Sequence, residues 1–316
     1  MTSPRHFIAT DDVNADEIVG LLDFADDLKR ERGASISSQS AAMRDDLAGR
    51  TVAMIFEKPS TRTRVSFQVA VAELGGHPLP LSSAELQLGR GETIADTGAV
   101  LSRYVHAIVV RTFAQQRLVD LASTSSVPVV NALSDDEHPC QALADLQTFR
   151  QAHGTFGGKV LTYVGDGNNV AHSLLVAGAM VGLSIRIAHP DGYAPDLRFV
   201  AKARQFAAQS GAEIVVTSDP VAAVAGAHAV YTDVWASMGQ EDEHAARVAA
   251  FEGFQVDEAL MRHADPSAIF LHCLPAHRGE EVSGEVIDGP ASRVFDQAEN
   301  RLHAQKALLA TLMSGR

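Results

Sequence analysis

The chain has few cysteines and no long apolar run. Only Cys140 and Cys273 occur among 316 residues, which is too few for a disulfide framework and fits a reducing compartment such as the cytoplasm. No apolar run approaches the roughly 20 residues that span a bilayer, so no membrane span is expected. The first residues, MTSPRHFIATDD, turn acidic before an apolar core develops, and this pattern is not that of a signal peptide.

Basic residues are the minority among the charged ones. The chain has 39 Asp and Glu against 26 Lys and Arg, a formal charge of −13, which argues against a large surface for nucleic acid or anionic membranes. A hydrophobic fraction of 46% is that of a folded protein. At roughly 100–200 residues per domain, the length predicts two domains.

Short apolar runs alternate with helix-like stretches along the whole chain. Such buried runs separated by helices predict an α/β fold of two doubly wound parallel sheets, with ligands beyond the carboxyl ends of the strands. The strands are expected at 51–56, 106–111, 127–131, 159–165, 183–189, 212–218, 228–234 and 267–273.

The domain boundary is expected in a helix near residue 150. Ser134 and Glu137 have the spacing of a capping box, which predicts that this helix starts at Ser134. The glycine-rich segment 153–159 follows it. We therefore expect domains at 1–150 and 151–296, joined by interdomain helices, with an amphipathic helix in 297–316 that packs back on the first domain.

The strongest local signal is FEKPSTRTRVSF at 56–67. A strand leads into a loop of hydroxyl and guanidinium groups, and a helix then begins. Free N–H groups at a helix start, together with arginines, favour a phosphate. The alternative is that Ser60 only caps the helix and the arginines are solvated. No Walker sequence is present, so a nucleotide is not the first expectation.

A second polar segment, SDDEHPCQALADLQ at 134–147, places His138 and Gln141 three residues apart. On a helix they would share one face. A histidine at this point is as consistent with a structural hydrogen bond as with a functional role. No HExxH or zinc-type cysteine spacing occurs, so no metal is expected.

The segment GDGNNVAHS at 165–173 follows one strand and opens a helix. It differs from a dinucleotide fingerprint because Val170 stands at the third glycine position and the next strand ends in His189 instead of an acid. A tight turn that presents Asn168 or Asn169 to a substrate is the favoured interpretation.

Two further strand ends carry reactive groups. Asp233 ends one predicted strand and could pair with a substrate ammonium group; the polar loop that follows, 235–253, could act as a lid. Cys273 follows another buried strand, where a thiol is either inert packing or an orienting group. Arg301, at the start of the last helix, could add a cation.

Together these segments resemble one family over nearly the whole chain. The sequence is similar to the ornithine branch of the aspartate and ornithine carbamoyltransferases. The shared motifs are STRTR at 60–64, HPCQ at 138–141, GDGNN at 165–169, DVWASMG at 233–239, HCLP at 272–275 and ENR at 299–301.

The resemblance implies the residues of two substrate sites. Those expected to bind carbamoyl phosphate are Ser60, Thr61, Arg62, Thr63, Gln87, Arg111, His138, Gln141, Cys273, Leu274 and Arg301. Those expected to bind L-ornithine are Asn169, Asp233, Ser237 and Met238. Arg111, His138 and Cys273 are the implied catalytic residues, and no metal or organic cofactor is implied.

The resemblance also implies a homotrimer with shared sites. The loop ELQLGRGET at 85–93 would carry Gln87 into the neighbouring subunit's site. Many relatives have a basic residue where this chain has Gly91, with Arg90 beside it. Lys58, Arg62, Arg64, Arg90, Arg111 and Arg301 lie in segments expected to converge near one phosphate.

The implied reaction is carbamoyl transfer to the δ-amine of ornithine, giving citrulline and phosphate. The neutral amine would attack directly, through a tetrahedral intermediate stabilised by Arg111, His138 and Thr63. Three alternatives remain open. One is a carbamoyltransferase for putrescine, acylated ornithine or aspartate, another is an NAD-dependent dehydrogenase built on GDGNN, and the last is a catalytically inactive sensor or scaffold.

Overall fold

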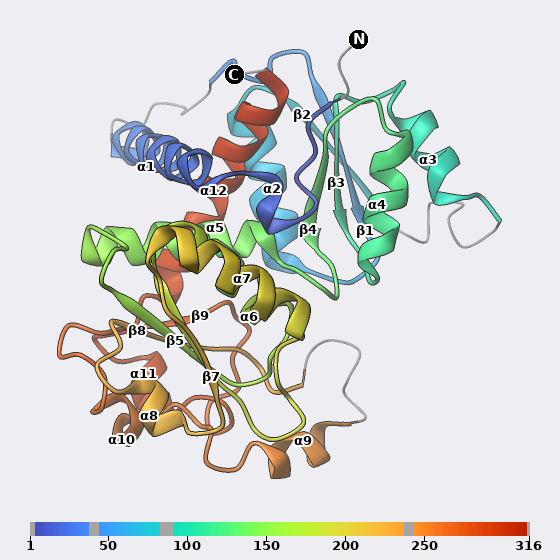
Figure 1. Cartoon of the computed structure of the whole chain (residues 1–316). Coiled ribbons are helices and arrows are strands. Elements are labelled where there is room, and N and C mark those ends of the chain that lie inside the picture. The colour runs from blue at the N-terminus through green and yellow to red at the C-terminus, as the bar shows by residue number, and fades with distance from the viewer. Residues whose placement is uncertain (1–3, 38–43, 83–90, 237–242, 315–316) are drawn as a thin grey trace. The chain divides into compact units, whose positions relative to one another are not determined.

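The computed structural model describes residues 4–37, 44–82, 91–236 and 243–314. The chain divides into two compact units (Figure 1). Unit 1 contains Met1–Ala144 and Asn300–Arg316, and unit 2 contains Asp145–Glu299. Within the described residues, no helix combines the length and apolar character that crossing a membrane requires.

Unit 1 is built on a four-stranded parallel sheet in the order β2-β1-β3-β4. Figure 1 shows α3 and α4 on one side of this sheet and α1 and α2 on the other. The strands are β1 (Thr51–Phe56), β2 (His77–Ser82), β3 (Ala107–Arg111) and β4 (Val129–Leu133). The helical elements are η1 (Thr10–Asp12), α1 (Ala15–Ser37), α2 (Thr61–Glu73), α3 (Ile94–Leu101) and α4 (Gln115–Thr124).

Unit 2 has a five-stranded parallel sheet in the order β7-β6-β5-β8-β9. Its strands are β5 (Val160–Val164), β6 (Ser184–Ala188), β7 (Ile214–Thr217), β8 (Ala229–Thr232) and β9 (Ile269–His272). Its helices are α6 (Asn169–Met180), α7 (Leu197–Ser210), α8 (Pro220–Val224), α9 (His244–Ala250), α10 (Glu258–Met261) and α11 (Gly284–Ile287). Two further helices, α5 (Pro139–His153) and α12 (Val294–Ser314), contribute residues to both units. The predicted class of two parallel-sheet α/β domains is therefore confirmed.

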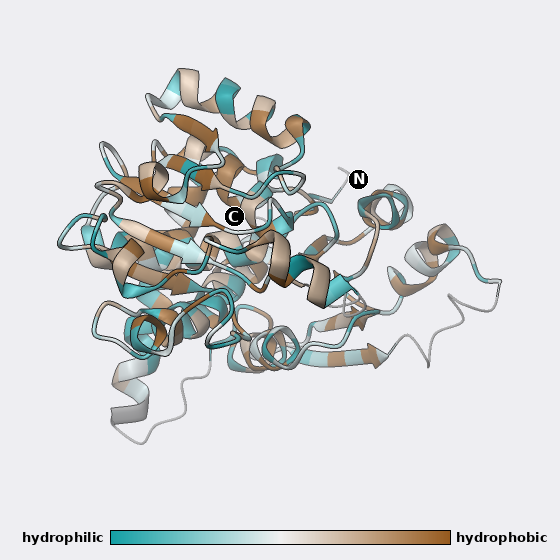
Figure 2. Cartoon of the chain, turned by 90° about the horizontal axis from the view of Figure 1, so that it is seen from below, coloured by the Kyte–Doolittle hydropathy of each residue, from teal (hydrophilic) through white to brown (hydrophobic). Residues whose placement is uncertain are grey.

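The strands bury apolar side chains on both faces, as parallel sheets require. Strands β3, β4, β8 and β9 are fully buried, and their residues are apolar or aromatic except for Arg111, Asn131, Thr232 and His272. The brown colour of the strands in Figure 2 follows this pattern. Helix α6 is buried from Val170 to Met180, so it is a core element and not a surface helix.

Strand β2 was absent from the sequence prediction. Its sequence, HPLPLS, contains Pro78 and Pro80, which cannot donate backbone hydrogen bonds. The strand is nevertheless formed because it lies at the edge of the sheet and pairs only with β1. An edge position tolerates proline because the missing N–H groups are not needed for a second partner strand.

The predicted helix start at Ser134 is wrong. Helix α5 begins at Pro139, and Ser134 instead closes a turn in which its hydroxyl accepts from the backbone N–H of Glu137 at 3.1 Å. The Glu137 carboxylate does not complete a capping box, because it accepts from the backbone N–H of Thr10 at 2.8 Å. The spacing is that of a capping box, but the Glu137 carboxylate accepts its hydrogen bond from Thr10, which is distant in the sequence, and not from the backbone of Ser134.

Candidate active site

In both sheets the strand order reverses at one pair of neighbouring strands. In unit 1 this pair is β1 and β3, and in unit 2 it is β5 and β8. Ligands of doubly wound sheets bind at such points, beyond the carboxyl ends of the strands. Ser60, Asn168 and Asp233 lie in the segments that follow β1, β5 and β8, and Arg111 is the last residue of β3. The topology therefore places predicted site residues of each unit at its reversal.

Ser60 caps helix α2. Its hydroxyl accepts from the backbone N–H of Thr63 at 3.2 Å, and Thr61 and Arg62 form the first turn that follows. The remaining N–H groups of a first turn and the helix dipole favour an anion. The capping and the anion-binding interpretations of this segment are therefore compatible.

A cationic cluster formed by Arg62, Arg111 and Arg301 surrounds His138 in unit 1. Burial lowers the pKa of His138 well below its ordinary value, and the charges of Arg301, Arg111 and Arg62 lower it further. Arg301 also donates to the hydroxyl of Thr63 at 2.6 Å. The imidazole is consequently neutral at neutral pH, and the arginines supply the positive charge.

Two residues of α5 that follow His138, Cys140 and Gln141, are buried and make hydrogen bonds within the protein. Gln141 is buried, and its backbone N–H donates to the His138 carbonyl at 3.0 Å. Cys140 donates from its thiol to the Asn131 carbonyl at 3.3 Å, and burial raises its pKa to about 12. Cys140 is therefore a protonated core thiol.

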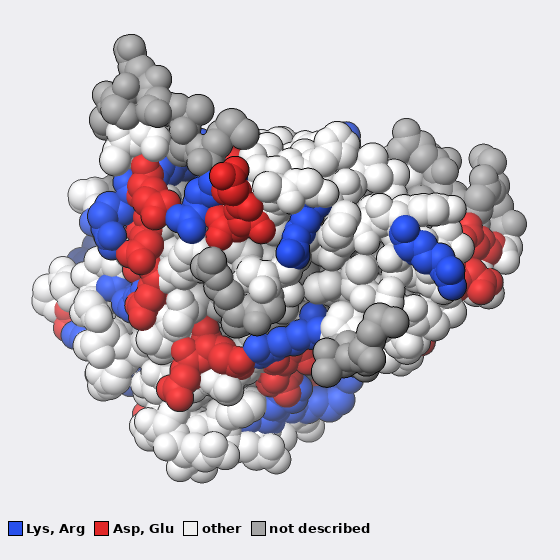
Figure 3. All heavy atoms as spheres, turned by 90° about the horizontal axis from the view of Figure 1, so that it is seen from above, with Lys and Arg blue, Asp and Glu red and all other residues white. Residues whose placement is uncertain are grey.

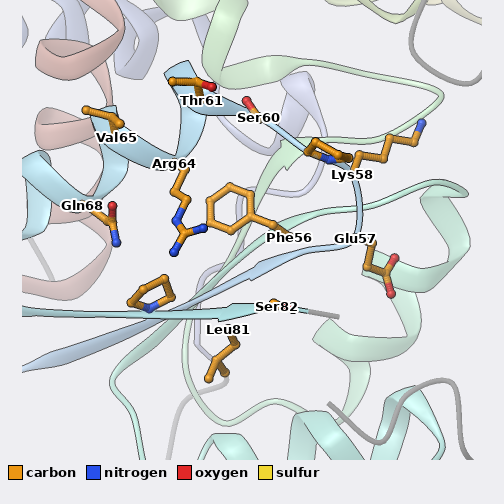
Figure 4. Close-up of a pocket in the computed structure, with 12 residues that line it drawn as sticks. Phe56, Glu57, Lys58, Ser60, Thr61, Arg64, Val65, Gln68, Leu81 and Ser82 are labelled. Carbon is orange, nitrogen blue, oxygen red and sulfur yellow. The ribbon is translucent and has the colours of Figure 1, made fainter. Parts of the chain in front are cut away.

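Not all of the basic side chains expected to converge on a phosphate belong to the cationic cluster. Lys58 pairs with Asp135 at 2.6 Å and lies 4.5 Å from the ring centroid of Phe113. Arg64 is exposed and lines a pocket of about 710 Å³ with Ser60 and other residues of unit 1. Figure 4 shows the Arg64 side chain reaching beside the ring of Phe56, with Lys58 extending away from it.

The exterior has a different charge distribution from the cluster. On the face shown in Figure 3, basic side chains alternate with acidic ones and, among the described residues, form no continuous basic area. Much of the positive charge that could bind an anion is therefore held in the buried side chains of Arg111 and Arg301, which the net charge of −13 does not reveal.

Asp233 is the corresponding charged group of unit 2. It is buried, and its Oδ2 accepts from the side-chain amide of Asn168 at 3.0 Å. Its Oδ1 accepts from the backbone N–H of Val234 at 2.8 Å and from the thiol of Cys273 at 3.0 Å. The structure thus brings together the predicted carboxylate and the predicted cysteine, from the ends of β8 and β9.

The HCLP segment is fixed by a buried histidine. The Nδ1 atom of His272 accepts from the backbone N–H of Leu274 at 2.8 Å. Its Nε2 atom must then carry the proton, which it donates to Glu281 Oε1 at 3.1 Å. Leu274 has a φ of 59°, which is unusual for a branched residue and typical of functional strand ends.

The GDGNN turn differs from a dinucleotide-binding turn in two ways. Asn168 caps α6, accepting from the backbone N–H groups of Val170 and Ala171, while Asn169 begins the helix. A Cβ at Gly167 would lie 2.1 Å from the backbone nitrogen of Pro195. The space that a pyrophosphate would need beside the second glycine is thus filled by the chain itself, which weakens the dehydrogenase alternative.

Four predicted site residues or neighbours cannot be compared with the structure. Gln87, Arg90, Ser237 and Met238 lie outside the described residues, as does most of the first part of the expected lid. Gly91, where many relatives have a basic residue, has a φ of 101°, which disfavours any side chain there.

Sequence reasoning missed one largely buried ion pair of unit 2, which joins Arg247 and Asp166. Arg247 of α9 pairs with Asp166 at 2.8 Å and donates to the carbonyl of Trp235 at 2.9 Å. Burial raises the pKa of Asp166, and Arg247 opposes this effect. Asp166 lies within the GDGNN motif, and its polar loop position was the only available signal.

A metal could in principle contact the group formed by Asp233, His272 and Cys273. Their ligand atoms lie within 4.8 Å of one another. However, both ring nitrogens of His272 are engaged by hydrogen bonds, and the thiol donates to the carboxylate. The arrangement is complete without an ion.

One α/β unit holds buried cations at its sheet end and the other holds a buried carboxylate, an arrangement suited to an enzyme that binds one anionic and one cationic substrate. The chain belongs to the aspartate/ornithine carbamoyltransferase family. Residues 5–151 match the family's carbamoyl-P binding domain, and residues 157–312 match its Asp/Orn binding domain.

Individual relatives agree with this assignment. An ornithine carbamoyltransferase of Parafrankia sp. is 57% identical over 309 residues, which cover 98% of this chain and 96% of the relative. An anabolic ornithine carbamoyltransferase of Pyrococcus furiosus is 58% identical over 269 residues, 85% of each chain. The solved structure of an ornithine carbamoyltransferase from Pyrococcus furiosus matches with a TM-score of 0.93 and 52% identity, covering 99% of this chain and 98% of that one.

Proposed function

We propose that the protein transfers the carbamoyl group of carbamoyl phosphate to the δ-amine of L-ornithine, giving L-citrulline and phosphate. The observation that carries this function is the buried Asp233 carboxylate, held by Asn168 and Cys273. It is an anion suited to the α-ammonium group of an amino acid. The similarity to proteins named ornithine carbamoyltransferase, at more than half identity over nearly the whole chain, supports the same reaction.

Carbamoyl phosphate is bound by residues of unit 1. The start of α2, with Ser60, Thr61, Arg62 and Thr63, receives the phosphate, because helix N-terminal amides and a guanidinium group complement its charge. Gln141 lies in the first turn of α5, three residues after His138, and contacts the carbamoyl amide. Gln87 from a neighbouring subunit and Leu274 complete the set that the family resemblance implies.

Arg111, His138 and Thr63 act on the carbamoyl oxygen, and Arg301 is joined to this group by its hydrogen bond to the Thr63 hydroxyl. The neutral imidazole donates a hydrogen bond, while the guanidinium groups stabilise the negative charge that develops on this oxygen. Such preorganised donors are typically worth about 3–4 kcal/mol each. The depressed pKa of His138 is consistent with hydrogen bonding by a neutral ring and not with general acid catalysis by an imidazolium.

L-Ornithine is bound by residues of unit 2. Asp233 pairs with its α-ammonium group, and Asn169, Ser237 and Met238 contact its α-carboxylate and backbone. The thiol of Cys273, fixed by its hydrogen bond to Asp233, orients the δ-amine and favours its neutral form. The attacking amine must be neutral because only then does its nitrogen carry a lone pair.

The reaction is a direct substitution at the carbamoyl carbon. The δ-nitrogen forms a bond to this carbon, and a tetrahedral oxyanion results. The carbon–oxygen bond to phosphate then breaks, phosphate leaves with the bonding electrons, and the nitrogen loses a proton to it. Arg62 and the start of α2 stabilise the leaving phosphate. No thioester, metal or organic cofactor enters these steps.

We also propose a cytoplasmic homotrimer that works in arginine biosynthesis. The two free cysteines fit a reducing compartment. The trimer rests on the family resemblance of 85–93, and the biosynthetic direction rests on the anabolic relative. We place carbamoyl-phosphate binding in the predicted domain 1–150 with 297–316, and ornithine binding in 151–296.

A citrulline assay tests the reaction. Purified protein is given carbamoyl phosphate with ornithine, putrescine, N-acetylornithine or aspartate in separate reactions. We expect rapid product formation with ornithine, since only an α-amino acid with a free side-chain amine satisfies Asp233 and the attack. Preferred turnover of another amine would contradict the substrate, and ligand binding without turnover would favour the inactive sensor.

A further inference from the structure

A second group of ligating side chains lies after the HCLP segment of unit 2. The ligand atoms of His277, Glu280 and Glu281 all lie within 4.8 Å of one another. The Nε2 atom of His244, at the start of α9, lies 3.0 Å from Glu280 Oε2. None of these four residues belongs to the substrate sites described above.

Glu281 distinguishes this group from an ordinary exposed acidic cluster. Its side chain is fully buried. Its Oε1 accepts from His272 Nε2 and from the backbone N–H of His277, at 3.1 and 2.6 Å. Its Oε2 is also buried and, among the residues that the structure describes, has no hydrogen-bond partner. A buried carboxylate oxygen without a partner is costly, and a bound cation would satisfy it.

The unpartnered oxygen faces the histidine of the same group. Glu281 Oε2 lies 3.8 Å from His277 Nδ1, and Glu280 Oε2 lies 3.9 Å from the same nitrogen. Zinc–ligand bonds of about 2.0–2.1 Å in a tetrahedron place neighbouring ligand atoms roughly 3.3 Å apart. The separations of 3.0, 3.8 and 3.9 Å each differ from this value by about 0.6 Å or less. His244 contacts the group through Glu280 and would have to approach the other two ligands for an ion to be enclosed.

We propose that His244, His277, Glu280 and Glu281 form a binding site for a divalent transition-metal ion of the Zn²⁺ class. Two neutral imidazoles and two carboxylates balance the charge of such an ion. Imidazole ligands suit zinc and its neighbours, whereas Mg²⁺ and Ca²⁺ prefer oxygen ligands alone. The zinc-type sequence spacing was absent because His244 comes from a different element than the other three residues.

The ion would be a structural ligand and not a part of carbamoyl transfer. Glu281 accepts from His272 through its other oxygen, and His272 accepts from the backbone N–H of Leu274. Occupation of the site would therefore stiffen the HCLP segment through one carboxylate. It would also tie α9, which lies within the expected lid segment 235–253, to the loop at 277–281.

The test must separate this site from the group formed by Asp233, His272 and Cys273. The full-length chain with Cys273→Ser, freed of metal with a chelator, is titrated with Zn²⁺ by calorimetry at neutral pH, and its thermal unfolding is followed with and without Zn²⁺. In the unsubstituted chain, Co²⁺ absorption reports a sulfur ligand through its charge-transfer band.

We expect one Zn²⁺ per Cys273→Ser chain, a higher midpoint of unfolding with Zn²⁺, and a Co²⁺ spectrum without sulfur charge transfer. Adding His277→Ala or Glu280→Gln should weaken binding by about tenfold or more, since each removes a ligand from a partly exposed position. His263→Ala and Glu285→Gln change exposed residues of unit 2 outside the group and should leave binding unchanged.

Three results would overturn the site. One is the lack of Zn²⁺ binding by the Cys273→Ser chain, and another is equal affinity of the His277→Ala and His263→Ala variants. The third is a sulfur charge-transfer band for the first equivalent of Co²⁺. Glu281→Gln provides a further check. Its stability is first measured without metal, and the folded variant should then bind Zn²⁺ more weakly than the Cys273→Ser chain.

Discussion

The two units have the same architecture but hold opposite charges at their sheet ends. Unit 1 places three guanidinium groups around His138, and this environment keeps the imidazole neutral. Unit 2 places the Asp233 carboxylate among hydrogen-bond donors from Asn168, Val234 and Cys273. A parallel sheet with a reversed strand order therefore provides a location for ligands, while the residues that follow the strands determine the sign of the charge that is bound.

The difference also concerns how each charge is stabilised. In unit 1, buried cations repel one another, and an anion placed among them reduces this repulsion. In unit 2, a single carboxylate is surrounded by fixed donors and needs one cation. The comparison predicts that substitutions in each unit should change the binding of a different substrate.

The largest effect is expected for Asp233→Asn. Removal of the charge should lower kcat/KM for ornithine by at least about 30-fold, because truncating one partner of a buried charge pair costs about 2–5 kcal/mol. The KM for carbamoyl phosphate should change little. Steady-state kinetics with each substrate varied in turn measures both quantities.

Asp191→Asn is the matched control for this variant, since Asp191 is an exposed carboxylate of the same unit. It should leave both kinetic parameters unchanged. If Asp233→Asn raised the KM for carbamoyl phosphate as strongly as that for ornithine, the division of substrates between the units would be wrong.

A smaller loss is expected for Arg62→Ala. A charge-assisted contact to phosphate is worth roughly 1.5–3 kcal/mol, so kcat/KM for carbamoyl phosphate should fall by at least about tenfold. Arg62→Lys should retain part of the activity because it keeps the charge but not the planar fork. Arg103→Ala, which removes an exposed arginine of unit 1, serves as the control. Near-normal kinetics of Arg62→Ala would remove this loop from the mechanism.

The smallest expected effect is on the pH dependence of stability. Burial and the three arginines lower the pKa of His138 in the folded chain, whereas an unfolded histidine titrates near about 6.5. As the pH falls below that value, the unfolded chain binds a proton that the folded chain does not. Stability present above about pH 6.5 is thus lost toward acid.

Urea unfolding at about pH 7.5 and about pH 5.5 measures this effect. The loss of stability between the two values should be smaller for His138→Gln than for the unsubstituted chain, while His263→Gln, at an exposed position, should behave like the unsubstituted chain. The same pH dependence in all three proteins would mean that His138 is not held neutral by its surroundings.

Much of the fold was accessible from the sequence because buried strands and amphipathic helices have strong periodicities. The exceptions have physical causes. Strand β2 contains two prolines that only an edge position tolerates, and the Ser134 turn depends on a contact from Thr10 to Glu137. Such long-range contacts leave no trace in local spacing.

For the candidate site, the sequence indicated the main residues but not the contacts that hold them in place. Strand ends and motif resemblance indicated Arg62, His138, Asp233 and Cys273, but not their partners. Neither the Arg247–Asp166 ion pair nor the buried Glu281 has a local sequence signal, because each contact joins segments separated along the chain. The lowered pKa of His138 likewise depends on its burial and on three arginines from different elements.

The close approach at Gly167 has a consequence for protein engineering. The backbone at Ala194 and Pro195 occupies the space that any side chain at this position, or a phosphate group beside it, would require. Conversion of this unit into a nucleotide-dependent enzyme would therefore first require shortening or redirecting the segment 190–196. If only residues within the turn were substituted, the backbone of Ala194 and Pro195 would still fill the space that the phosphate group needs.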